Sequence, residues 1–266
     1  MADLTPTYSL LEGMLRVRAY ADRQSAGAAA AKETAAKLRK LLAVQQDVRM
    51  VFAAAPSQNE FLDSLAVEPG IDWHRITAFH MDEYIGLEGA SPETFGYYLK
   101  NRLFDKVRPG RVHLMNPTRG VESEIASYDA LIREAPIDIV CLGVGENGHL
   151  AFNDPPVADF SDPEWIKVVE LDQVCRQQQV NDGCFASLEA VPTYALTLTI
   201  PAIMSAISLV CIVPGERKRE AILRTLYGEI STACPSTILR KHPDCILYTD
   251  QEELRREAGA LVGGKG

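Results

Sequence analysis

Short apolar runs recur along the chain, separated by stretches whose apolar residues follow a helical spacing. The runs are typical of buried strands and fall at residues 48–55, 75–81, 112–115, 137–142, 207–213 and 245–249, with strand-like pieces at 168–171 and 194–200. Helical spacing covers residues 8–24, 26–44, 59–65, 95–104, 121–133, 218–227 and 252–261. Ser91 is the expected N-cap of the helix over 95–104, with Pro92 at its first position.

Alternating strands and helices predict an α/β fold. We expect a doubly wound, largely parallel sheet with helices on both faces. No stretch rich in Gly, Ser or Pro divides the chain, so we expect one domain over residues 1–266.

Composition narrows the class of protein. With 47% hydrophobic and 24% charged residues, the chain has the make-up of a soluble globular protein. Its net charge of −9 argues against a nucleic-acid or membrane partner, although a locally positive site could still bind an anionic substrate. The six cysteines are scattered without a C-x-x-C pair, and the N-terminus lacks the pattern of a signal peptide. We therefore expect a cytoplasmic protein.

Residues 143–155 form the most informative stretch. They follow the apolar run 137–142 and begin with three glycines within six residues, then add His149, Asn153 and Asp154. Glycines in such a loop allow a tight turn or a close approach of the backbone to another group. In open α/β sheets, ligands bind at the carboxyl ends of the strands, where this loop is expected.

Two further segments are expected to meet this loop. Asp82 and Glu83 end the strand over 75–81, and Lys218 opens the helix after the strand over 207–213. A carboxylate and a histidine brought together form a general acid–base pair, and a cation at a helix N-terminus attracts an anion. Solvated loop charges and a surface lysine are the alternative interpretation. His80 and His113 lie within strands, and we interpret both as structural.

Other chemistries are poorly supported. Gly143, Gly145 and Gly148 match the spacing of a dinucleotide loop, but they do not lie in the first strand–helix unit, and Glu170 is only a loose candidate for the ribose-binding acid. No two His or Cys residues stand at metal-ligand spacing, so we predict no metal.

Several motifs resemble the glucosamine-6-phosphate isomerase/deaminase family. The segment FHMDEYIGL at residues 79–87 resembles the family's MDEY-x-GL signature, and residues 143–155 resemble its G-x-G-x-x-GH-x-AFNEP loop. The VPTYALT segment at 191–197, the GERK turn at 215–218 and the PSTIL segment at 235–239 follow in the family's order. The related 6-phosphogluconolactonases share the start of the loop but continue differently after the histidine.

The resemblance implies a Rossmann-like fold and conversion of an amino-sugar phosphate to a keto-sugar phosphate with loss of ammonia, without metal or cofactor. Asp82 would move a proton between sugar carbons, and His149 would open the ring, supported by Asn147 and Asp154. The implied substrate-binding residues are Ser57, Gln58, Glu83, Gly145, Gly148 and Lys218, with Lys218 holding the phosphate. A homo-oligomer is left open.

The chain departs from the family pattern at several positions. Asn147 stands where the family has Asp, and it is expected to orient the imidazole through its amide oxygen or to adopt a left-handed turn. Asp154 replaces a Glu, Ala53–Gln58 replaces a loop rich in Gly and Thr, and Arg176 is the nearest substitute for a further arginine. A lactonase and a non-catalytic sugar-phosphate sensor are therefore kept as alternatives.

Overall fold

A computed structural model describes residues 4–88, 91–251 and 254 of the chain. Its main sheet has eight strands in the order β1-β2-β11-β10-β7-β3-β4-β6. Every neighbouring pair is parallel except β1 and β2, which form an antiparallel hairpin at one edge. The predicted doubly wound, largely parallel sheet is therefore confirmed.

The central strands are buried on both faces. The main-sheet strands are β1 (Tyr8–Glu12), β2 (Leu15–Ala19), β3 (Val48–Phe52), β4 (Ile76–His80), β6 (Arg111–His113), β7 (Ile139–Leu142), β10 (Ser208–Ile212) and β11 (Cys245–Thr249). Successive side chains point to opposite faces, so Met50 and Phe52 join one apolar cluster while Val51 joins a second. Two cores, one on each side, explain why these strands appear in the sequence as continuous apolar runs.

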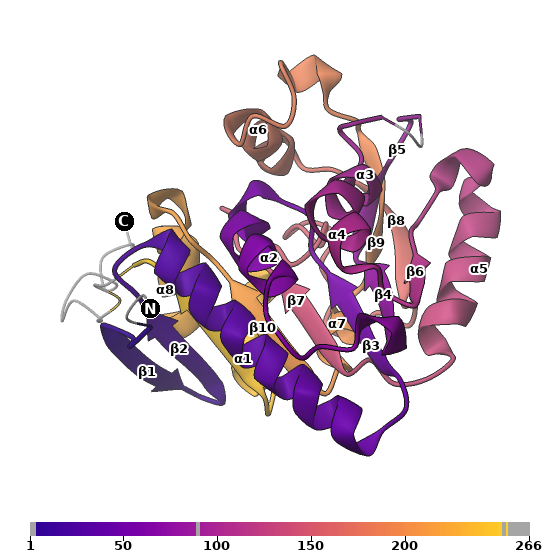
Figure 1. The fold of residues 1–266 in the computed structure, drawn as a ribbon. Coiled ribbons are helices and arrows are strands. Elements are labelled where there is room, and N and C mark those ends of the chain that lie inside the picture. The colour runs from indigo at the N-terminus through magenta and orange to yellow at the C-terminus, as the bar shows by residue number, and fades with distance from the viewer. Residues whose placement is uncertain (1–3, 89–90, 252–253, 255–266) are drawn as a thin grey trace, which may run out of the picture.

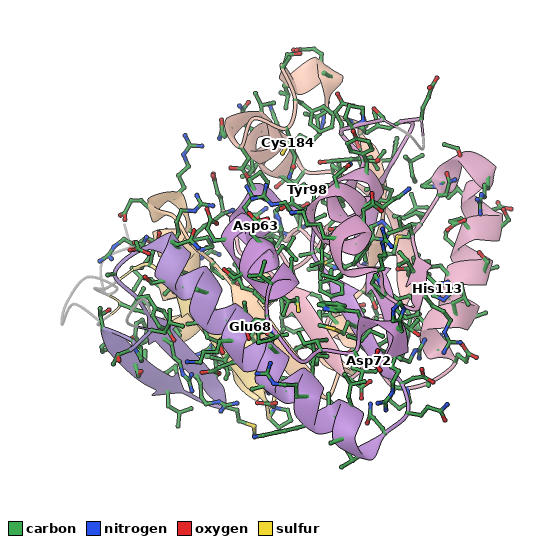
Figure 2. All side chains as sticks on the ribbon, viewed as in Figure 1. Asp63, Glu68, Asp72, Tyr98, His113 and Cys184 are labelled. Atoms are coloured by element: carbon green, nitrogen blue, oxygen red, sulfur yellow. The ribbon has the colours of Figure 1, made fainter. Side chains whose placement is uncertain are left out.

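Helices cover both faces of this sheet. They are α1 (Arg23–Val44), α2 (Asn59–Ala66), α3 (Phe95–Leu99), α4 (Asp105–Val107), α5 (Val121–Arg133), α6 (Gln173–Asn181), α7 (Ile200–Met204) and α8 (Arg219–Tyr227). Figure 1 shows α1 and α2 in front of the strands and α6 at the top of the view. Figure 2 shows side chains filling the space between these helices and the sheet. In the described part of the chain, no helix is both long and apolar enough to cross a membrane.

A second, three-stranded antiparallel sheet was not predicted. It has the order β5-β9-β8, with β5 at Asp82–Ile85, β8 at Ile166–Glu170 and β9 at Tyr194–Leu198. Asp82 and Glu83 therefore begin β5, and the prediction that they end the preceding strand is wrong. The chain leaves the main sheet at Met81, and Asp82 pairs with Thr197 of β9.

The helix predicted over residues 8–24 is wrong. This segment forms the β1–β2 hairpin, which turns at Gly13 with φ of 61°. Leu15, Val17 and Ala19 are fully buried at every second position, which is the period of a strand. The helix prediction places the apolar residues on one helical face across Gly13, whereas the left-handed turn at this glycine divides the segment into two strands.

Smaller corrections concern helix ends and short helices. Thr94, not Ser91, caps α3, and its side chain accepts a hydrogen bond from the Tyr97 N–H at 3.3 Å. The predicted helix over 95–104 continues from α3 through a π-helical turn at Lys100–Phe104. Helices α6 and α7 were not predicted, and the helix predicted over 252–261 lies outside the described residues apart from Leu254.

Gly27 lies where α1 meets α2, and it offers a test of this packing. A Cβ at Gly27 would lie 2.7 Å from Glu60 Cβ and 2.8 Å from the Phe61 nitrogen. Alanine gains about 1 kcal/mol of helix propensity over glycine, but overpacking costs about 1–3 kcal/mol. We expect Gly27→Ala to lower the free energy of unfolding by about 1 kcal/mol, measured by urea denaturation. Lys32→Ala, at an exposed position of α1, is the control and should leave it nearly unchanged.

Candidate active site

One cavity lies at the carboxyl ends of β3, β7 and β10, where successive connections leave the sheet in opposite directions. The chain runs from β3 outward to β4 and β6, whereas β10 and β11, the main-sheet strands that come after β7, lie on its other side. Ligands bind at such switch points because the loops separate and leave a crevice. The cavity is lined by residues from several segments, among them Ser57, Gln58, Asp82, Gly145, His149, Gln178, Gln179 and Lys218. The predicted convergence of Asp82, His149 and Lys218 is confirmed.

Asp82 presents a nearly buried carboxylate to this cavity. Its relative exposure is 7%, and within the described residues its side chain makes no hydrogen bond or ion pair. Burial, and then the charge of Glu83, raise the pKa of Asp82 well above its usual range. A carboxylate in this state is suited to accept a proton from a bound molecule.

His149 is held from behind by Asp154 and Asn147. His149 Nδ1 lies 2.8 Å from Asp154 Oδ1, and Asp154 is 1% exposed. Burial raises the pKa of Asp154, but the neighbouring imidazole and the Asn147 amide outweigh burial, and the net pKa is lowered. Asp154 thus remains a carboxylate that can stabilise a protonated imidazole.

Asn147 acts differently from the sequence-based expectation. Its Nδ2 donates to Asp154 Oδ1 at 2.8 Å, and its Oδ1 accepts from the backbone N–H of His149 at 3.0 Å. The amide oxygen therefore does not orient the imidazole directly. Asn147 is not left-handed either, since Gly148 has the positive φ of 88° in this turn.

Glycines are required at two points of the loop. A Cβ at Gly145 would lie 2.2–2.4 Å from three atoms of the His149 ring, which therefore packs directly against the backbone. A Cβ at Gly148 would lie 2.5 Å from Cys234 Sγ. Gly145 lines the cavity, whereas Gly148 does not; it shapes the loop and accepts a hydrogen bond from the Ser236 N–H at 2.8 Å. No helix starts after Gly148, so the dinucleotide interpretation fails.

Lys218 supplies a positive charge to the cavity. The residue is 7% exposed, its ammonium group forms no hydrogen bond or ion pair within the described residues, and burial lowers the pKa of this group. Gln58 lies nearby and donates to Ile212 O and to Ser57 Oγ, each at 3.2 Å. A buried cation without a partner, beside side-chain amides and a hydroxyl, can bind an anionic group.

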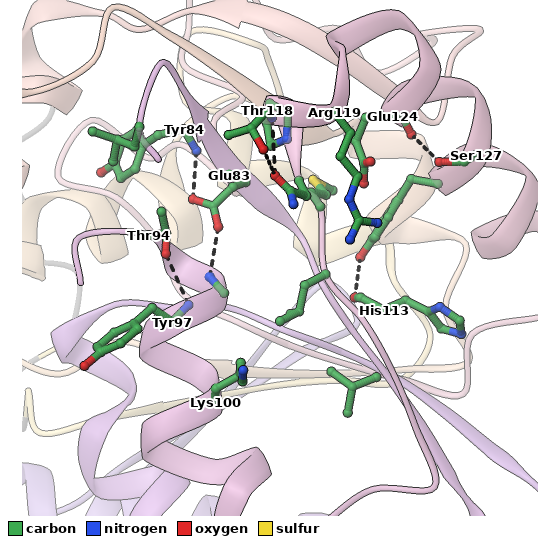
Figure 3. A pocket seen from close by; sticks show the side chains of 18 of the residues that line it. Glu83, Tyr84, Thr94, Tyr97, Lys100, His113, Thr118, Arg119, Glu124 and Ser127 are labelled. Carbon is green, nitrogen blue, oxygen red and sulfur yellow. Dashed lines mark hydrogen bonds between the residues drawn. The ribbon is translucent and has the colours of Figure 1, made fainter. Parts of the chain in front are cut away.

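Glu83 does not reach this cavity. Its carboxylate accepts from the backbone N–H groups of Tyr84, Phe95 and Gly96 at 2.9–3.1 Å, and so ties β5 to the start of α3. Figure 3 shows it at the wall of a separate cavity of about 660 Å³. Strand alternation explains the separation, because adjacent residues of β5 face opposite sides. The larger cavity contains neither Asp82 nor His149, so the smaller one remains the candidate active site.

Three residues of α6 were missed from the sequence. Gln178 and Gln179 line the cavity, and Gln178 accepts from the Glu146 N–H at 2.9 Å. Cys175 lies beside Asp154 and His149. Burial, and then the Asp154 charge, raise the pKa of its thiol well above the usual range. Asp172, whose side chain caps α6 at the Val174 N–H, was the sequence signal from which this helix could have been predicted.

Arg176, the candidate substitute for the family's further arginine, does not line the cavity. It donates to Leu188 O and Val191 O.

Comparison with known proteins agrees with this geometry. A sequence profile of the glucosamine-6-phosphate isomerases/6-phosphogluconolactonase family matches residues 21–247. The chain belongs to this family.

The chain is similar in sequence to glucosamine-6-phosphate deaminases, and it shares its fold with 6-phosphogluconolactonases at lower identity. A glucosamine-6-phosphate deaminase of Listeria welshimeri is 34% identical over 207 residues, covering 77% of this chain and 86% of that protein. A solved monomeric glucosamine-6-phosphate deaminase is 28% identical with a TM-score of 0.81, covering 90% and 99% of the two chains. A 6-phosphogluconolactonase of Thermotoga maritima is 18% identical with a TM-score of 0.70, covering 88% and 98%, and shares the fold.

The contact between Gly145 and His149 can be tested in this family member. Gly145→Ala would push the imidazole out of place, and displacement of a catalytic group by about 1 Å can cost about 10²-fold in rate. We expect a loss of that order in kcat, measured in a steady-state assay, with unchanged circular dichroism. Gly143→Ala is the matched control, because the atom nearest to its Cβ would be the flexible Gln58 amide nitrogen at 3.1 Å, and its next contact, Ile212 O at 3.4 Å, is ordinary van der Waals contact. Equal losses in both variants would contradict a specific role for Gly145.

Proposed function

We propose that this protein is a glucosamine-6-phosphate deaminase/isomerase that acts without a metal cofactor. It converts an amino-sugar phosphate and water to a keto-sugar phosphate and ammonia. The observation that carries the proposal is the position of Asp82 and His149 in one cavity with the unpaired cation Lys218. The deaminases of Listeria welshimeri and Bacillus cereus, at 34% and 35% identity, support it.

In the proposed reaction His149 first opens the sugar ring. It takes the proton of the O1 hydroxyl and gives it to the ring oxygen, which leaves an aldehyde at C1. Asp154 lies 2.8 Å from the imidazole and stabilises its transient positive charge. The proposed role of His149 therefore gives a reason for the buried Asp154 carboxylate beside it.

Asp82 then carries out the isomerisation. Its carboxylate removes the proton from C2. The C2–H electron pair then forms the C1–C2 double bond of an enolamine, while the substrate's own ammonium group gives a proton to the C1 oxygen. Asp82 returns its proton to C1 as the nitrogen lone pair forms an iminium at C2, and water hydrolyses this iminium to the ketone and ammonia, released as the ammonium ion. The raised pKa of Asp82 makes it a stronger base than an ordinary carboxylate.

Ammonia release from glucosamine 6-phosphate is the deciding experiment. We expect ammonia and a keto-sugar phosphate in equal amounts. Glucosamine without phosphate should react far more slowly, and 6-phosphogluconolactone should not be hydrolysed above the uncatalysed rate. Lactone hydrolysis without ammonia release would establish the lactonase alternative, and binding without either reaction would indicate a sensor.

Asp82→Asn separates a catalytic role from a structural one. Loss of a general base costs about 10²–10⁴-fold in kcat. Because the folded pKa of Asp82 is raised, the folded state favours its protonated form, and stability decreases as pH rises through that pKa. A neutral Asn avoids this penalty, so at pH 8 the variant should melt at or above the wild-type Tm while kcat falls. A lower Tm together with full kcat would assign Asp82 to folding instead.

Lys218→Ala tests recognition of the phosphate. The variant should raise KM for glucosamine 6-phosphate by about 10-fold or more, since hydrogen bonds to charged groups contribute about 1.5–3 kcal/mol. KM for unphosphorylated glucosamine should change little. Arg217→Ala, at the exposed neighbouring position, is the control. Equal changes in KM for both substrates would show that Lys218 does not bind the phosphate.

A further inference from the structure

Three potential metal ligands meet behind the candidate active site. His149 and Asp154 come from the 143–155 loop, and Cys175 comes from α6. A ligand atom from each lies within 4.8 Å of the other two, and all three residues are buried. The proposed reaction assigns roles to His149 and Asp154, but it gives none to the thiol.

The cluster contains buried polar atoms with unused bonding capacity. Asn147 donates to Asp154 Oδ1, whereas Asp154 Oδ2 has no nitrogen or oxygen partner within the described residues and has only the weak thiol of Cys175 beside this carboxylate. His149 Nδ1 is close to Asp154 Oδ1 but likewise lacks a well-aligned hydrogen bond there. An unsatisfied buried polar atom destabilises the fold, and a bound cation would satisfy both atoms at once.

We propose that His149, Asp154 and Cys175 form a binding site for a thiophilic divalent cation such as Zn²⁺, which competes with the sugar. Nitrogen, carboxylate oxygen and thiolate sulfur are the ligands that Zn²⁺ takes, at about 2.0–2.3 Å in tetrahedral geometry. Ligand atoms around such an ion lie about 3.5 Å apart, so the side chains need to close by about 1 Å. Asp154 lines a separate cavity on the other side, from which water can supply the fourth ligand.

The charges of the cluster balance around a divalent cation. On binding, the Cys175 thiol releases its proton to solvent and becomes a thiolate, with no change of oxidation state. The thiolate and the Asp154 carboxylate then neutralise the two positive charges, and His149 stays neutral. The neutral amide of Asn147 adds no third negative charge, and it orients Asp154 as outer-shell partners of metal ligands do.

Occupation of this site would remove His149 and Asp154 from the reaction. Zn²⁺ should therefore inhibit turnover reversibly, and a chelator should restore it. This consequence rests on the proposed function, whereas metal binding itself does not. A spectroscopic probe measures metal binding independently of turnover, and so distinguishes failure of the metal site from failure of the proposed function.

Co²⁺ titration of the chelator-treated full-length protein tests the site. We expect a thiolate-to-cobalt charge-transfer band together with the visible bands of tetrahedral Co²⁺. Cys175→Ser should lose the charge-transfer band and bind Zn²⁺ more than about 10-fold more weakly, since even loss of an outer-shell partner costs 10–100-fold. Cys184→Ser is the matched control. Cys184 is half-buried after the end of α6 and outside the cluster, so the band should persist (Figure 2).

Several outcomes would overturn the proposal. Wild-type protein without a charge-transfer band, or a band that persists in Cys175→Ser, excludes the thiol as a ligand. A band without inhibition by Zn²⁺ of ammonia release would disprove the competition with the sugar. If the protein bound Co²⁺ through Cys175 but released no ammonia under any condition, the metal site would stand and the proposed function would fail.

Discussion

Parallel pairing of β3 with β7 is the constraint on which the candidate site depends. The pair joins two halves of the sheet that the chain builds in opposite directions, so their following loops separate instead of covering one another. The crevice receives Ser57 and Gln58 from one side, His149 from the centre and Lys218 from the strand beyond. Asp82 lines the same crevice because the chain passes from the end of β4 to β5 of the second sheet beside it. A charged, poorly solvated cluster is thus produced by strand order alone.

Much of this arrangement was predictable because the central strands are buried on both faces. Continuous apolar runs identify β3, β7, β10 and β11, and the polar residues directly after them mark the carboxyl edge. Helix α6 escaped prediction because its sequence, QVCRQQQVN, is mostly polar and presents a weak apolar face. Its glutamines nevertheless line the cavity. The polar residues of α6 line a site and do not pack in a core. The spacing of apolar residues along the sequence therefore does not detect this helix.

Glu83 and Asn147 show the limit of residue type as a guide. Both are polar residues inside specific motifs, yet Glu83 binds three backbone N–H groups and Asn147 bridges Asp154 to the loop. The Asn147 side chain can both donate and accept, and its NH2 group donates to a carboxylate. An Asp at that position would set two carboxylates against each other, so the amide and the short Asp154 side chain form a consistent pair.

The β1–β2 hairpin lies outside the range that matches the family profile, and it changes what the sheet presents to other molecules. Parallel pairing of β2 with β11 over five residue pairs covers a fully buried strand that would otherwise end the sheet. An uncovered β11 would expose a row of free N–H and C=O groups beside apolar side chains, which is a template for strand addition by a second copy. Strand β2 therefore keeps this edge of β11 from pairing with a second copy, and chains that lack residues up to Ala19 should be prone to aggregate through it.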